Sequence, residues 1–136
     1  VLSIVLYCAA LNIMYLSSTL YHSFFALGRT TVYVFSILDY SGIFLLIAGS
    51  YSPFLGILFY EEWWAAGMLA LMWTVALVGV CTAAFYTGPY AMPLRLSLYI
   101  TLGWAIVIVG RPMIRKLGPY GSSLLLLGGL LYTGGV

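Results

Sequence analysis

Three polar side chains, those of Ser18, His22 and Asp39, stand out because they lie inside long apolar stretches of the sequence. His22 is the only histidine in the chain. Ionisable groups at membrane depth are costly and generally face a protein-lined cavity, so they indicate a functional site by default. Serine, histidine and acidic residues are also the residue types that carry out hydrolysis or bind metal ions. These three residues are therefore the candidate functional residues.

The spacing of the three residues predicts that they converge. Ser18 and His22 are four residues apart and so share one face of a helix. The turn between the first two apolar segments is centred near Arg29 and Thr30. His22 lies about seven residues before that turn and Asp39 about nine after it, so at about 1.5 Å of rise per residue their depths differ by only a few ångström. Antiparallel neighbouring helices would bring Ser18, His22 and Asp39 to one level.

One chemistry that this set suggests is a serine-hydrolase triad, because triads are recognised by geometry and not by their order in the sequence. The spacing argues against it. Ser18 and His22 on one helix face offer neither a nucleophile elbow nor an oxyanion hole.

Two other interpretations remain open from the residues alone. A catalytic zinc ion usually needs about three protein ligands besides water. The chain has one histidine, and Cys8 lies four turns away from it, so further ligands would have to come from elsewhere. Alternatively, His22 is hydrogen-bonded to a serine or to Asp39 and only joins two helices, which in membranes contributes about 1 kcal/mol.

The amino-acid composition indicates the class of protein in which these residues lie. Of the 136 residues, 64% are hydrophobic and only 6% are charged. A soluble domain carries about a quarter charged residues, so this chain predicts an integral membrane protein. The net charge of +2 comes from very few groups and gives no indication of a nucleic-acid partner.

Five apolar segments are separated by residues that break helices, and each is long enough, or nearly so, to cross a hydrocarbon core about 30 Å thick. They do not alternate between apolar and polar residues, so they predict an all-α transmembrane bundle and not a β-barrel. Pro53 is expected to kink or end the second helix, and residues 111–119 to separate the fourth from the fifth. The expected segments are 1–27, 33–59, 63–86, 93–110 and 120–136.

Small residues recur with helical spacing on the second segment, where Gly42, Gly49 and Ser50 follow Asp39. Small faces allow membrane helices to approach closely. This stripe therefore predicts a helix–helix contact beside Asp39.

Four stretches of the chain resemble the hemolysin III family, the mostly bacterial branch of the progestin and adiponectin Q receptor (PAQR) superfamily. The resemblance covers nearly the whole chain, and its most specific part combines S-x-x-x-H with a downstream L-D-x-x-G-I. The four stretches are SSTLYHSF at 17–24, LDYSGIFLLIAGSYSPF at 38–54, YITLGW at 99–104 and LLGGLLYTGGV at 126–136.

This resemblance implies a seven-helix membrane protein with a zinc ion near the cytoplasmic side. In that arrangement His22 is a zinc ligand, Asp39 holds the water that zinc activates, and Ser18 supports the site. The remaining ligands belong to an H-x-x-x-H motif on the seventh helix, which residues 1–136 do not contain. We therefore expect a single transmembrane domain truncated at both ends, with five of the seven helices.

The function expected from this resemblance is a zinc-dependent hydrolase in the cell membrane that acts on a lipid-like amide or ester. Zinc would act as the Lewis acid and Asp39 as the general base. Two alternatives belong to other classes. One is a pore-forming or membrane-perturbing protein, as the haemolytic phenotype behind the family name suggests. The other is a lipid-sensing receptor. In each case the expected partner is a membrane lipid.

Overall fold

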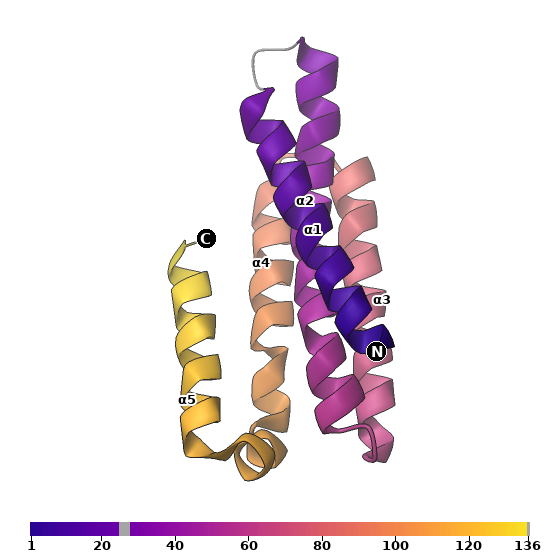
Figure 1. The fold of residues 1–136 in the computed structure, drawn as a ribbon. Coiled ribbons are helices and arrows are strands. Elements are labelled where there is room, and N and C mark those ends of the chain that lie inside the picture. The colour runs from indigo at the N-terminus through magenta and orange to yellow at the C-terminus, as the bar shows by residue number, and fades with distance from the viewer. Residues whose placement is uncertain (25–27, 136) are drawn as a thin grey trace.

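The computed structural model describes residues 1–24 and 28–135, and that part of the chain is helical and contains no strand (Figure 1). The five α-helices confirm the predicted all-α bundle. A π-helical turn, η1, and a 3-10 turn, η2, continue α2 and α4. The elements are α1 (Leu2–Ser23), α2 (Arg29–Pro53), η1 (Phe54–Leu58), α3 (Trp63–Phe85), α4 (Ala91–Trp104), η2 (Ala105–Val109) and α5 (Gly110–Gly135).

Four helical runs of the described residues are long and apolar enough to cross a membrane. They comprise α1, α2 with η1, α3, and a continuous run of 45 residues from α4 to the end of α5. The expectation that residues 111–119 form a non-helical break is therefore wrong for most of that segment. The helix continues to Leu117 and is interrupted only at Gly118, which has a φ of 71°.

Both prolines of this segment fit the observed kink. Pro112 lies in the first turn of α5, and Pro119 directly follows the interruption at Gly118. Proline lacks an N–H group and is tolerated where a helix starts, because that donor has no partner there. Glycine adopts a positive φ without the steric cost of a Cβ. As a result, α4 and the outer part of α5 run as separate segments, joined by a short helical piece across the end of the bundle (Figure 1).

Pro53 ends α2, as the sequence predicted, and the chain continues as the π-helical turn η1. The missing N–H of proline removes one helical hydrogen bond, and such positions are common causes of helix irregularity.

Glycines of α2 and η1 form the contact with α1, which packs across α2 (Figure 1). A Cβ added at Gly42 would lie 2.8 Å from Ser17 Oγ, and one added at Gly49 would lie 2.6 Å from Ala10 Cβ. The predicted small-residue contact is thus present. It extends to Gly56, which lies beside Ser3.

Substituting Gly49 by valine is expected to weaken this contact more than substituting Gly56. Ala10 Cβ is attached directly to the backbone and cannot rotate away, whereas the Ser3 hydroxyl can. Overpacking of this kind typically costs about 1–3 kcal/mol, so we expect Gly49→Val to lower the melting temperature by roughly 5–10 °C. Thermal unfolding in detergent would measure it, with Gly103→Val, which meets nothing within 4 Å, as the control. Equal shifts for Gly49→Val and Gly103→Val would contradict the expected effect.

The core lies where α2, α3 and α4 meet, and Phe44 is at its centre with no exposed surface. Its ring packs against Tyr99 of α4, with centroids 4.4 Å apart, and against the backbone of Gly79 in α3. The absence of a side chain at Gly79 leaves the space that this ring occupies.

Long polar side chains connect the ends and breaks of different helices. The Tyr51 hydroxyl of α2 donates to the carbonyl oxygens of Leu102 and Gly103, just before α4 tightens into η2. Lys116 of α5 donates to the carbonyl oxygen of Leu58 at the end of η1, 2.6 Å away. Carbonyl groups at helix ends lack helical partners, so Lys116 satisfies a group that the helix leaves free. Tyr51 instead adds a second donor at Leu102, whose carbonyl oxygen also accepts from the N–H of Ala105.

Candidate functional site

Asp39 is a buried acid in a membrane-spanning helix, with 8% of its surface exposed. Gly42 of the same helix faces α1, and Tyr40 faces Arg95 of α4. In a helix of about 3.6 residues per turn, Asp39 lies about 60° from Gly42 and about 100° from Tyr40. Asp39 therefore lies on the side of α2 between its α1 face and its α4 face.

The packing of α1 on α2 sets the level of Asp39 along α1. Gly42 lies against Met14 and Ser17, and the ring of Phe35 stacks on that of Phe24 with centroids 5.9 Å apart. This antiparallel register places Asp39 opposite residues 17–20 of α1, the turn that contains Ser18.

His22 lies one turn of α1 nearer to the connection with α2. Its side chain is exposed and packs edge-on against the Tyr21 ring, with centroids 5.1 Å apart. Ser18 is half-buried. No hydrogen bond within the described part of the chain joins the side chains of Ser18, His22 and Asp39 to one another. The structure thus places Ser18 and Asp39 at one level and His22 about one turn away.

The donor groups of these residues fit only part of a metal site. In residues 1–24 and 28–135 there is no group of three or more histidine, cysteine, aspartate or glutamate side chains that could hold a metal ion. A catalytic zinc ion usually has about three protein ligands. His22 can supply one imidazole nitrogen and Asp39 a carboxylate, so a complete site needs ligands beyond the described residues.

A second buried charge, Arg95 of α4, lies over the ring of Tyr40, the residue after Asp39, and was not among the candidate residues from the sequence. Arg95 is 9% exposed, and its Cζ lies 4.7 Å from the centroid of the Tyr40 ring. The Tyr99 hydroxyl, one turn further along α4, donates to the carbonyl oxygen of Tyr40 at 2.8 Å. The rule that selected His22, a charge inside an apolar segment, applies equally to Arg95 and would have found it.

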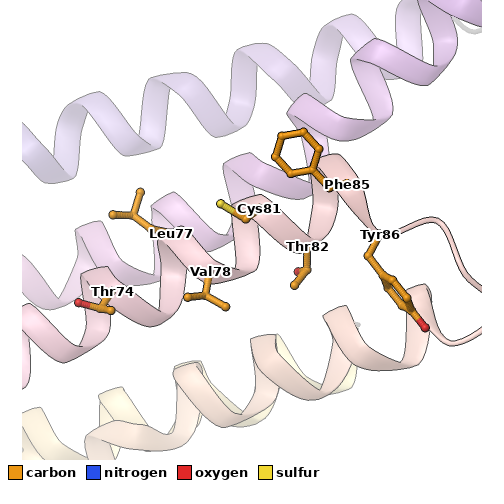
Figure 2. A pocket seen from close by; sticks show the side chains of 7 residues that line it. All are labelled: Thr74, Leu77, Val78, Cys81, Thr82, Phe85 and Tyr86. Atoms are coloured by element: carbon orange, nitrogen blue, oxygen red, sulfur yellow. The ribbon is translucent and has the colours of Figure 1, made fainter.

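A shallow hollow of about 520 Å³ lies along α3 and includes none of the candidate residues. Figure 2 shows its side chains along the surface of that helix, and they are predominantly apolar. The hollow therefore provides a surface for hydrocarbon and not a site for polar chemistry. It is lined by Thr74, Leu77, Val78, Cys81, Thr82, Phe85 and Tyr86.

Comparisons with known proteins agree with these observations. The family model described as "Haemolysin-III related" matches residues 1–136. The chain is 38% identical over 136 residues to Hemolysin-3 of Bacillus cereus, covering 99% of this chain and 60% of that protein. It is 34% identical over 140 residues to a Hemolysin-3 homolog of Bacillus subtilis (strain 168), covering 99% of this chain and 62% of that protein.

The chain therefore spans about three fifths of the length of these relatives. No solved structure matches it. The family match over the full length and the four helical runs capable of crossing a membrane lead to one conclusion. The chain belongs to the haemolysin-III-related family and is part of a multi-pass cell membrane protein.

Proposed function

We propose that this protein is a zinc-dependent membrane hydrolase that acts on a lipid-like amide or ester. The observation that carries this proposal is the burial of Asp39 in a membrane-spanning helix, level with Ser18 and about one turn from His22. A carboxylate is costly at this depth and is generally retained there for function.

The three residues have different proposed roles. His22 would hold the metal through an imidazole nitrogen, and its exposed ring would leave the metal accessible to ligands from parts of the protein outside the described residues. Asp39 orients a water molecule and accepts its proton. Ser18, half-buried at the same level, would support the site by hydrogen-bonding to this water. Zinc, when bound, would polarise the substrate carbonyl and lower the pKa of water.

A membrane lipid is the proposed substrate because the site lies among helices that cross the bilayer. The Bacillus cereus relative carries the name Hemolysin-3, and cleavage of membrane lipids is one way to damage a cell membrane. The site needs additional metal ligands, so the proposal concerns the natural protein with any sequence that flanks residues 1–136.

The test is lipid hydrolysis by that protein in nanodiscs, supplied with zinc. Release of fatty acid from amide-linked and ester-linked lipids would be measured by mass spectrometry. We expect release that a zinc chelator abolishes and that Asp39→Asn lowers about 10²–10⁴-fold, since an amide cannot act as the base. Glu61→Gln is the matched control, because Glu61 is an exposed acid that accepts a hydrogen bond from Tyr60 outside the membrane spans.

Two results would overturn the proposal. One is the absence of any lipid product from a folded protein that contains zinc. The other is leakage of dye from vesicles that is insensitive to the chelator and unaffected by Asp39→Asn, which would assign the protein to the pore-forming class.

A further inference from the structure

Arg95 is a buried cation whose contacts join three helices. Its Nη2 donates to the carbonyl oxygens of Ala83 and Tyr86, at 3.3 and 3.1 Å, where α3 ends. The guanidinium group also covers the ring of Tyr40 in α2. Cations near the C-terminal end of a helix interact favourably with its free carbonyl groups. Arg95 therefore holds the end of α3 and the Asp39–Tyr40 turn of α2 against α4.

These contacts leave part of the guanidinium group unsatisfied. The Nε atom of Arg95 is buried and has no hydrogen-bond partner among the described residues. Carbonyl groups and an aromatic ring carry no full negative charge. Burying a charge without an opposite charge is costly, so we expect an anion close to Arg95.

The chain offers one suitable anion. It contains three acidic residues, of which Glu61 and Glu62 lie between η1 and α3, outside the membrane-spanning runs. Asp39 lies within a span and is, like Arg95, nine-tenths buried. Asp39 directly precedes Tyr40, whose ring lies 4.7 Å from Arg95 Cζ and whose carbonyl oxygen accepts a hydrogen bond from Tyr99, one turn further along α4. Figure 1 shows that α2 and α4 lie in the same bundle, with the connection after α2 at the opposite end from the start of α4.

We infer that Arg95 is the counter-charge of Asp39 inside the membrane and a positioning residue for the Asp39 turn of α2. No hydrogen bond between them is present in the described residues, so the pairing acts across the Tyr40 ring or through a bridging water. At a given distance, opposite charges attract one another far more strongly in a low-dielectric interior than in water. This pairing does not require zinc, so it can hold even if the proposed hydrolase activity fails.

A double-mutant cycle tests this pairing in the natural protein, with any sequence that flanks residues 1–136, in detergent or nanodiscs. Asp39→Asn and Arg95→Gln each remove one charge and keep a polar side chain, of the same shape for Asp39 and shorter for Arg95. Each is expected to lower the melting temperature by roughly 10 °C, because it leaves the other charge buried alone. The melting temperature of the double variant is expected to be close to those of the single variants. Independent effects would instead add up to about 20 °C below the unsubstituted protein.

Matched substitutions separate charge pairing from simple capping of α3. Arg111→Gln removes an exposed cation from the first turn of α5 and should show no coupling to Asp39→Asn. Arg95→Lys keeps the charge but loses the planar donors, so it should lower the melting temperature less than Arg95→Gln.

Additive shifts for Asp39→Asn and Arg95→Gln would overturn the pairing and leave Arg95 as a cap of α3 alone. If Arg95→Gln does not fold, recovery of folded protein by adding Asp39→Asn supports the pairing. Failure of Asp39→Asn to restore folding overturns it. Folded protein would be measured by size-exclusion chromatography.

Discussion

Substituting Gly79 by leucine is expected to prevent normal assembly of the bundle. The Phe44 ring lies against the backbone of Gly79 so closely that a Cβ at this position would overlap it. The ring has no free space to move into, because it is fully buried and its other side packs on Tyr99. Leucine would therefore separate α3 from α2, and we expect a loss of most of the folded protein.

The yield of monodisperse protein on size-exclusion chromatography would measure this effect. Gly67→Leu is the matched control, since Gly67 lies in the same helix and a Cβ there meets nothing within 4 Å. The two variants add the same side chain to α3. Similar yields would show that the contact between Phe44 and Gly79 does not limit assembly.

Substituting His22 by alanine is expected to abolish most zinc binding by the natural protein. The proposed function makes His22 a direct ligand, and a catalytic zinc ion rarely has more than about three protein ligands. Asp39→Asn should keep much of the metal, since Asp39 is proposed to act through water. Ser18→Ala should have the smallest effect, because loss of a group that supports the ligands lowers metal affinity by about 10–100-fold.

Elemental analysis of the three purified variants would establish this order. Tyr21→Ala is a useful control, because it removes the ring that packs against His22 without removing a metal-binding group. Full zinc content in His22→Ala would end the metal-site interpretation, and His22 would then have a structural role only.

The helical architecture could be predicted from the sequence because apolar runs and their breakers are local features. The α1–α2 contact through Gly42 and Gly49 was likewise visible as a periodic pattern. The segment from Gly110 to Leu117 was not, since proline and glycine were interpreted as breakers although Pro112 lies where a helix tolerates it. The sequence pattern alone does not specify whether a proline lies before or within the first turn of a helix.

The sequence predicted the level of the candidate site along the helices but not the full set of residues that lie there. The spacing around the first connection predicted one level for Ser18, His22 and Asp39, because antiparallel helices have a fixed rise. The packing of α1 on α2 places Ser18 level with Asp39 and His22 about one turn away. The spacing did not reveal that Arg95 approaches Tyr40, since this contact joins residues far apart in the sequence and depends on how α4 packs on α2. Metal binding, catalysis and the lipid partner remain predictions.

The polar side chains that satisfy carbonyl groups between helices also bear on the order of synthesis. Arg95, Tyr99 and Lys116 each donate to a carbonyl group earlier in the chain, at the end of α3, within α2 and at the end of η1. A ribosome releases the N-terminal part first, so α3 leaves it before the arginine that completes its C-terminal end. The helices α3 and α4, separated by only a short connection, are thus expected to enter the bilayer as a pair, because Arg95 can donate to the carbonyl groups at the end of α3 only when both helices are present.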